Sequence, residues 1–212
     1  MDNSESVCIL PMQNERIILH IFDALNPPRL VSLDSFGKRE ITFGRKPDRD
    51  IILFSPLVSR VHGRFIQTGD RWLFQDQNST NGFVYNGANT DEGLVETDNF
   101  IRVDDGVETV PDGVLILFGT PTYSDIWQVI PASAWHDKYG LTNISPYLTA
   151  AMEKIGEEYS LVKTIQNTRV QVNREPLTGR LHLHEKDVIS VPGCRVVFTK
   201  QALYVNFLIE PQ

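Results

Sequence analysis

Short apolar runs, separated by turn-forming residues, make up the first 130 positions of the chain. The runs are rich in Val, Ile, Phe and Trp, and the positions between them hold mainly Gly, Asn, Asp and Pro. No amphipathic helical pattern interrupts the series, and strands of this length and spacing are typical of an antiparallel sandwich or barrel. The predicted strands are Arg16–Phe22, Arg39–Phe43, Ile51–Leu53, Gly63–Gln67, Trp72–Gln75, Phe83–Tyr85, Phe100–Val103, Val114–Phe118 and Asp125–Ile130.

The pattern becomes helical after residue 130. Ser133–Tyr139 is predicted to form one or two helical turns that end at Gly140. Ser145-Pro146 has the form of an N-cap followed by a proline in the first turn. The residues that follow at helical spacing on one face are Leu148, Ala151, Met152, Ile155 and Tyr159. We therefore predict an amphipathic helix that packs on a sheet, with a partner-binding face as the alternative.

From Leu161 the strand pattern returns and repeats an earlier one. Each copy runs from a strand through an Asn-led turn, a strand ending in acidic residues and a Gly to an apolar strand. The first copy is 83–87, 100–105 and 113–118, and the second is 170–174, 181–187 and 193–198. We predict a β domain at 8–130, a helical connector at 131–160 and a second, partial β unit at 161–212. A partial sandwich has unpaired edges, so we expect it to dock on the helix, on the first domain, on a second chain or on sequence beyond Gln212.

The composition is that of an ordinary globular protein, with 41% hydrophobic and 22% charged residues, which excludes extended disorder. No apolar run approaches the roughly 20 residues of a membrane-spanning helix, and the N-terminal residues lack the pattern of a signal peptide. Cys8 and Cys194 are too few for a disulfide framework, and His182 and His184 have no third metal ligand nearby in the sequence. We expect a cytoplasmic chain, or the cytoplasmic part of a larger protein, with no metal, no cofactor and no membrane insertion.

The charge is distributed unevenly. The chain carries a net charge of −7, yet the stretch 38–71 is rich in Lys and Arg and the stretch 76–112 is mainly acidic. An acidic protein is a poor partner for nucleic acid, because that affinity depends on many phosphate contacts. A local basic patch on an acidic body suits one small anion better, although such a cluster is often only a solvated face.

Three polar clusters lie in the turns between the predicted strands. They are Gly44-Arg45, Ser59-Arg60-Val61-His62 and Asp76–Gly82, and Asn86-Gly87 follows them. Loops on a rigid sheet commonly carry binding residues, and a phosphate dianion is bound well by a guanidinium together with hydroxyl or amide donors. The sequence offers such groups in Arg45, Ser59 and Thr80. The alternative for Arg45 is a surface ion pair with Asp48 or Asp50.

The order of these motifs resembles the forkhead-associated (FHA) domain, whose hallmarks are GR, SxxH and SxNG. The resemblance covers roughly residues 8–130. It implies an all-β fold, an FHA-type antiparallel sandwich of about eleven strands, which binds phosphothreonine peptides through the loops at one end.

The resemblance also implies roles for five residues in binding the peptide. Arg45 and Ser59 would bind the phosphate, and Thr80 would add a hydroxyl or backbone contact. Arg60 and Asn81 would hold the peptide main chain on either side of the phosphothreonine.

Three further motif residues would build the site without touching the ligand, namely Gly44, His62 and Gly82. In the family the threonine methyl fits a small apolar niche, which explains why phosphoserine binds poorly. Family specificity depends largely on the residue three positions after the phosphothreonine. Because Leu57 precedes Ser59 by two positions, we expect an apolar residue to be preferred there over Asp.

The C-terminal repeat lacks these motifs, since it has Ile165-Gln166-Asn167-Thr168 where the first copy has Ser79–Gly82. Residues 161–212 therefore resemble a degenerate FHA half-domain without a phosphate site. The arrangement resembles the N-terminal regulatory region of FHA-containing bacterial ABC-transporter ATP-binding proteins, which implies an attached ATPase as a partner. The chain contains no GxxxxGK[ST] motif, so we expect no P-loop binding of ATP by the chain itself.

Two other classes of function remain as alternatives. The first is a phosphate-independent scaffold that acts through sheet edges or the predicted helix face. The second is an enzyme, but no motif places a nucleophile beside a base or pairs two carboxylates. We therefore predict a non-catalytic module that reads phosphothreonine.

Overall fold

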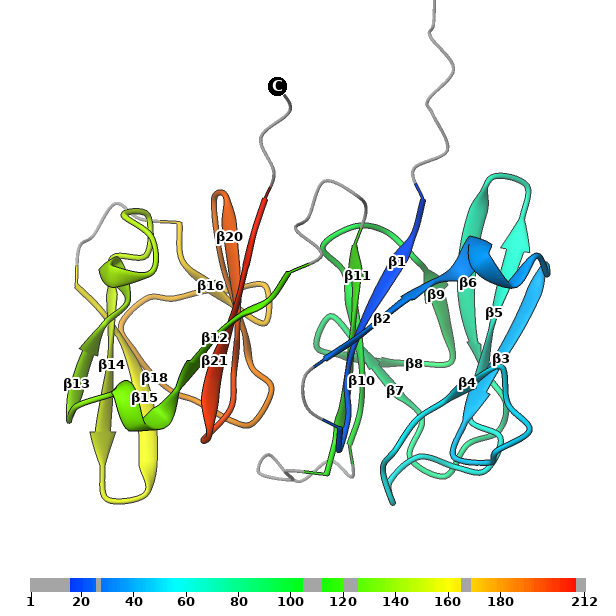
Figure 1. The fold of residues 1–212 in the computed structure, drawn as a ribbon, viewed down its shortest axis with the longest axis horizontal. Coiled ribbons are helices and arrows are strands. Elements are labelled where there is room, and N and C mark those ends of the chain that lie inside the picture. Colours follow the sequence, from blue (N-terminus) through cyan, green and yellow to red (C-terminus); the bar gives the residue numbers. More distant parts are fainter. Residues whose placement is uncertain (1–15, 26–27, 105–111, 120–125, 165–168, 209–212) are drawn as a thin grey trace, which may run out of the picture.

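The computed structural model describes residues 16–25, 28–104, 112–119, 126–164 and 169–208. These residues form two β-sandwiches that lie side by side along the long axis of the molecule (Figure 1). The predicted all-β class is therefore confirmed. Cys8, Asp125 and Ile165–Thr168 lie outside the described residues. The helices of the described chain are single short turns, and none of them has the length and apolar content to cross a bilayer.

The first sandwich consists of a six-stranded sheet and a five-stranded sheet. In spatial order, the first sheet is β2 (Arg29–Ser32), β1 (Ile18–Phe22), β11 (Val114–Gly119), β10 (Phe100–Val103), β7 (Phe83–Tyr85) and β8 (Ala88–Thr90). The second is β4 (Ile51–Ile52), β3 (Glu40–Gly44), β5 (Gly63–Thr68), β6 (Arg71–Asp76) and β9 (Glu92–Leu94). Neighbouring strands are antiparallel except β3 and β4. A 3-10 turn, Leu33–Phe36, links β2 to β3.

Aromatic side chains fill the space between these two sheets. Alternate residues of a strand face the same side, and this alternation turns Phe43, Phe65 and Phe74 of one sheet toward Phe83 and Phe118 of the other. The rings pack closely, with centroids 4.9 Å apart for Phe43–Phe65 and 5.5 Å apart for Phe74–Phe83. The core thus fixes the ends of β3, β5 and β7, from which the polar motifs project.

The second sandwich pairs a six-stranded sheet with a four-stranded one. The larger sheet is β12 (Gln128–Pro131), β21 (Ala202–Phe207), β20 (Cys194–Phe198), β19 (Val188–Val191), β16 (Gln171–Val172) and β17 (Glu175–Pro176). The smaller is β13 (Lys138–Gly140), β14 (Ala150–Ile155), β15 (Glu158–Lys163) and β18 (Arg180–His182). The 3-10 turns Ala132–Ala134 and Leu141–Asn143 flank β13.

The predicted amphipathic helix is wrong, because its residues form the β14–β15 hairpin. The turn is made at Gly156, whose φ of +63° few other residues adopt. Met152 and Tyr159 are buried in the core from opposite arms of the hairpin, whereas Ile155 at the tip is 68% exposed. A hairpin can therefore place apolar residues at spacings that also fit one face of a helix.

The predicted helical connector at 131–160 and the predicted partial β unit at 161–212 are also wrong. Ser133–Tyr139 holds part of a 3-10 turn and most of β13 rather than a helix. Strands from 128–163 and 171–207 share one hydrophobic core, to which Leu148, Leu161 and Val196 contribute. The second unit is therefore a two-sheet sandwich that begins at β12, and not a half sandwich that begins at Leu161.

The predicted repeat is confirmed for its first and third elements, and it extends further upstream than the sequence indicated. Its middle element was matched wrongly, because β10 (Phe100–Val103) corresponds to β19 (Val188–Val191) and not to 181–187, which contains part of β18. β3, β5, β6 and β9 follow one another in the first sandwich as β13, β14, β15 and β18 do in the second. The Asn-led turn is repeated in detail. Asn86 has a φ of +49° and accepts from the Phe100 amide, and Asn173 has a φ of +51° and accepts from the Val188 amide.

One strand position is filled differently in the two units. In the first sandwich the N-terminal strand β1 lies between β2 and β11. In the second the C-terminal strand β21 lies between β12 and β20. The same interior position of the two equivalent sheets is thus occupied by the first strand of one sandwich and by the last strand of the other.

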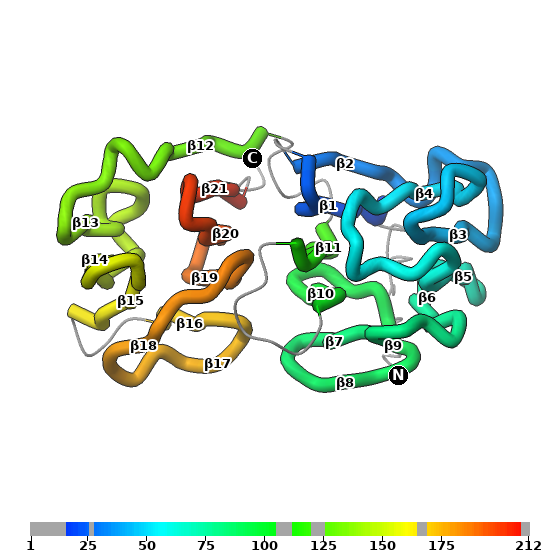
Figure 2. Tube along the Cα trace, turned by 90° about the horizontal axis from the view of Figure 1, so that it is seen from below, coloured from blue at the N-terminus to red at the C-terminus, as the bar shows by residue number. Residues whose placement is uncertain are grey.

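The two six-stranded sheets pack against each other through their outer faces (Figure 2). Phe22, Phe100 and Leu117 of the first sheet form a buried cluster with Val197 and Tyr204 of the second. Because these residues are apolar and buried, the contact holds the two sandwiches together in the manner of a core.

Candidate functional site

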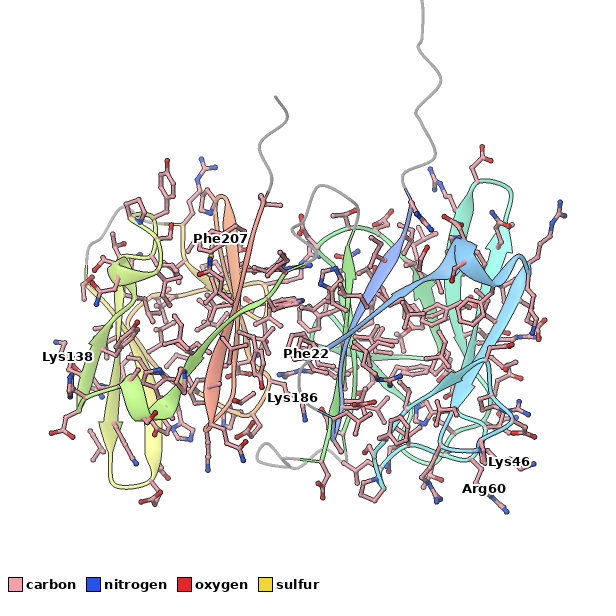
Figure 3. The ribbon with its side chains drawn as sticks, in the orientation of Figure 1. Phe22, Lys46, Arg60, Lys138, Lys186 and Phe207 are labelled. Carbon is pink, nitrogen blue, oxygen red and sulfur yellow. The ribbon has the colours of Figure 1, made fainter. Side chains whose placement is uncertain are left out.

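The Gly44-Arg45 and Ser59–His62 motifs meet at one end of the first sandwich, where Figure 3 labels Lys46 and Arg60. The loops after β3 and before β5 run beside each other. The Arg45 amide donates to the Ser59 carbonyl at 2.9 Å, and the Lys46 amide donates to the Arg60 carbonyl at 3.2 Å. These backbone bonds fix the relative positions of the two motifs.

The third motif joins them through side chains. The Thr80 amide donates to Ser59 Oγ at 2.9 Å, and Ser59 Oγ lies 3.3 Å from Thr80 Oγ1. Asn81 Nδ2 donates to the Leu57 carbonyl at 2.8 Å. Gly82 closes this loop with a φ of +65°, which suits glycine. The motifs that are separate in the sequence therefore form one loop cluster.

The His62 ring links its own loop to the loop that ends at Gly82. It is fully buried. Its Nδ1 accepts from the Ser59 amide at 3.0 Å, so Nε2 carries the proton and donates to the Gly82 carbonyl at 3.2 Å. Burial is the main cause that lowers the pKa of His62 below its ordinary value. A neutral ring with this tautomer satisfies both contacts, as the structural role assigned to His62 requires.

The loops enclose a hollow of about 410 Å³. Its lining residues are Arg45, Lys46, Ser59, Arg60, Val61 and Thr80. Arg45 Nε donates to the Val58 carbonyl at 3.0 Å, which orients the guanidinium. Among the described residues, nothing accepts from the two terminal nitrogens of Arg45, and none of the lining residues is acidic. The hollow can therefore receive an anion.

The nearby carboxylates are engaged elsewhere. Asp48 pairs with Arg49 and Lys46, whose hydrogen bonds lower the pKa of Asp48 to about 2. Asp50 pairs with Lys38, which is the main cause lowering the pKa of Asp50. The alternative ion pair of Arg45 with Asp48 or Asp50 is absent from the described part of the chain.

Residues 41–106 match the family model of the FHA domain. This segment contains all three motifs.

The first sandwich carries an FHA domain.

No curated protein sequence matches the chain. Three solved structures similar to it each align with about half of it. The Slr1951 protein from Synechocystis sp. is 27% identical, covering 50% of this chain and 96% of that chain with a TM-score of 0.42. The FHA domain of the CT664 protein from Chlamydia trachomatis is 24% identical, and the alignment covers 49% of this chain and 96% of that chain with a TM-score of 0.41. The N-terminal FHA domain of Rad53p from S. cerevisiae, in complex with a phosphothreonine peptide, is 25% identical, covering 50% and 93% with a TM-score of 0.41.

The structure brings together every residue that the sequence proposed for the FHA site. Arg45, Ser59, Arg60 and Thr80 line the hollow, and Asn81 stands beside it through its contact with Leu57. Gly44, His62 and Gly82, which were assigned structural roles, belong to the same loops as the lining residues. Sequence reasoning missed Lys46 and Val61 as lining residues, although Lys46 belongs to the basic stretch that it noted.

The second sandwich has the corresponding loop without the cation. Ser145 accepts from the Tyr147 amide as Ser55 accepts from the Leu57 amide. Gly140 ends β13 as Gly44 ends β3, and Leu141 follows Gly140 where Arg45 follows Gly44. Leu141 is fully buried. No group of three metal-ligating side chains occurs among the described residues of either sandwich.

We expect the free energy of unfolding to fall as the pH is lowered below about 6.5. The folded protein holds His62 neutral, whereas the unfolded chain binds a proton at the ordinary pKa, so acid favours the unfolded state. His20 acts in the same direction, because burial, and secondarily Arg195, lowers its pKa to about 3. Denaturant unfolding between about pH 5 and 8 measures the slope.

The His62→Gln variant is the control for this pH dependence. It should show a shallower decline than the wild type, with the remainder due to His20. An NMR titration in which the His62 ring protonates at or above 6.5 would contradict the assignment.

Proposed function

We propose that the chain binds phosphothreonine-containing peptides or proteins in the hollow at Arg45, Ser59 and Thr80. The observation that carries the proposal is the Arg45 guanidinium, held by Val58 yet open to solvent, beside two hydroxyl side chains that face the same hollow. A guanidinium with hydroxyl and amide donors suits the oxygens of a phosphate dianion. The FHA match of residues 41–106 supports this choice of ligand.

The roles of the flanking residues belong to the same proposal. Arg60 and Asn81 hold the peptide main chain on either side of the phosphothreonine, and Arg60 makes no ion pair within the described chain. One phosphate clamp and a few backbone contacts give a dissociation constant on the order of micromolar, about −8 kcal/mol. Such affinity suits a reversible switch set by a kinase and a phosphatase. The chain is then a non-catalytic, regulatory part of a signalling protein; the attached transporter ATPase and the bacterial, cytoplasmic setting stay predictions.

A titration with phosphopeptides tests the proposal. We expect a degenerate phosphothreonine library to bind in the micromolar range, and the unphosphorylated and phosphoserine libraries to bind at least about ten times more weakly. Deconvolution of the bound peptides should show an apolar residue, rather than Asp, three positions after the phosphothreonine. Equal binding of all three libraries, or none by the folded protein, would favour the phosphate-independent scaffold instead.

A further inference from the structure

A lysine of the second sandwich donates a hydrogen bond to the first sandwich next to the start of β11. Lys186 stands in the turn before β19, where its φ is +64°, and it is only 8% exposed. Its ammonium donates to the carbonyl of Gly113, the residue immediately before β11. Figure 3 labels Lys186 at the boundary between the two sandwiches.

The residue next to Gly113 is bonded to the loop that carries Ser59. The carbonyl of Asp112 accepts from Ser55 Oγ at 2.5 Å, and Ser55 is only 5% exposed. Ser55 also shapes the turn that follows it. Its Oγ accepts from the Leu57 amide at 3.1 Å, and its carbonyl accepts from the Val58 amide at 3.3 Å.

The turn at Ser55–Val58 orients two residues of the proposed site. The Leu57 carbonyl accepts from Asn81 Nδ2, and the Val58 carbonyl accepts from Arg45 Nε. Continuous contacts therefore lead from Lys186 through Asp112-Gly113 and Ser55 to the carbonyls that aim Arg45 and Asn81.

We propose that Lys186 is a positioning residue for the phosphopeptide site. By holding Gly113 it fixes Asp112 as the anchor of Ser55, and so it orders the turn that aims Arg45. The second sandwich, which has Leu141 in place of the arginine, thereby supports the site of the first. The inference rests on the function proposed above for that site.

Three variants at the same interface test this link, namely Lys186→Met, Lys186→Arg and Arg174→Met. Lys186→Met keeps an unbranched apolar stem and removes the donor. Arg174→Met removes a cation that contacts Asn99 across the same interface, where no described contact leads to Ser55. Two measurements are made on the full chain: hydrogen exchange of the Leu57 and Val58 amides without peptide, and the dissociation constant for a library-selected phosphothreonine peptide.

We expect Lys186→Met to speed exchange of both amides and to weaken peptide binding by roughly 3- to 10-fold. Arg174→Met should leave both unchanged, and Lys186→Arg, which keeps a donor, should restore most of the affinity. Equal effects of Lys186→Met and Arg174→Met would reduce the link to general interface stability and overturn the proposal. Unchanged exchange in Lys186→Met would overturn it whatever the peptide result. If the wild type binds no phosphopeptide, the proposed function fails, and with it the role in binding, while exchange alone decides whether Lys186 orders the turn.

Discussion

Replacing Arg45 with alanine should weaken phosphothreonine binding by at least about 100-fold, because charge-assisted hydrogen bonds contribute roughly 1.5–3 kcal/mol each. Arg45 lines the hollow, and no described residue accepts from its two terminal nitrogens. The fold should survive, since the Arg45 side chain is exposed and lies outside the core. Isothermal titration with a selected peptide measures the loss, and thermal unfolding verifies the fold.

Arg49→Ala is the matched control for this variant. Arg49 belongs to the same loop, but it pairs with Asp48 and does not line the hollow. Its removal deletes the same charge and should change the affinity by less than about threefold, because exposed pairs contribute little. Comparable losses in the two variants would mean that only the net charge of the loop attracts the peptide. Retained affinity in Arg45→Ala would remove Arg45 from the site.

Replacing Gly44 with alanine should destabilise the first sandwich by about 1–3 kcal/mol and abolish peptide binding. A Cβ on Gly44 would lie 2.6 Å from the Arg60 carbonyl oxygen and 3.1 Å from the His62 nitrogen. Both are backbone atoms of the neighbouring loop, so neither can swing aside as a side-chain end would. The loops must separate, which breaks the Arg45–Ser59 backbone bond. Chemical denaturation and peptide titration measure the two effects.

Gly140→Ala provides the matched control in the second sandwich. Gly140 ends β13 as Gly44 ends β3, and it has an ordinary φ of −79°. The nearest atom to an added Cβ is Thr142 Oγ1 at 3.6 Å, an ordinary contact. Alanine should therefore be neutral there or stabilise by up to about 1 kcal/mol. A Gly44→Ala protein as stable as Gly140→Ala would show that the loops of the site are not closely packed.

The site could be predicted from the sequence because its chemistry is concentrated in short turns. Arg45, Ser59 and Asn81 are polar residues at the ends of apolar runs, and their order matches one family of loops. Most strands of the first sandwich were predicted for a similar reason, since the alternation around Phe65 and Phe74 fits only a strand. The short strands β2, β8 and β9 were not predicted. Local sequence patterns were sufficient where short turns or the alternation of apolar residues along a strand fix the structure.

Other features depend on contacts between distant residues. Met152 and Tyr159 fit a helical face as well as a hairpin, and only their packing in a shared core decides between the two. Lys46 lines the hollow because its amide pairs with the Arg60 carbonyl, a register that no local pattern encodes. The contact of Lys186 with Gly113 joins two sandwiches, and it could not be inferred from either segment alone.

The equivalent position in the two six-stranded sheets is filled by β1 in the first sandwich and by β21 in the second. This difference affects the order in which the sandwiches can form on the ribosome. The first sandwich has all its strands once Gly119 has emerged. The second lacks a central strand until Phe207 is synthesised, and β12 and β20 meanwhile have unpaired edges. Since domains generally fold as units, beginning at the N-terminus during synthesis, the loops around Arg45 should close before Lys186 can reach Gly113. A nascent chain would then pass through a stage in which the phosphopeptide loops are formed but not yet supported.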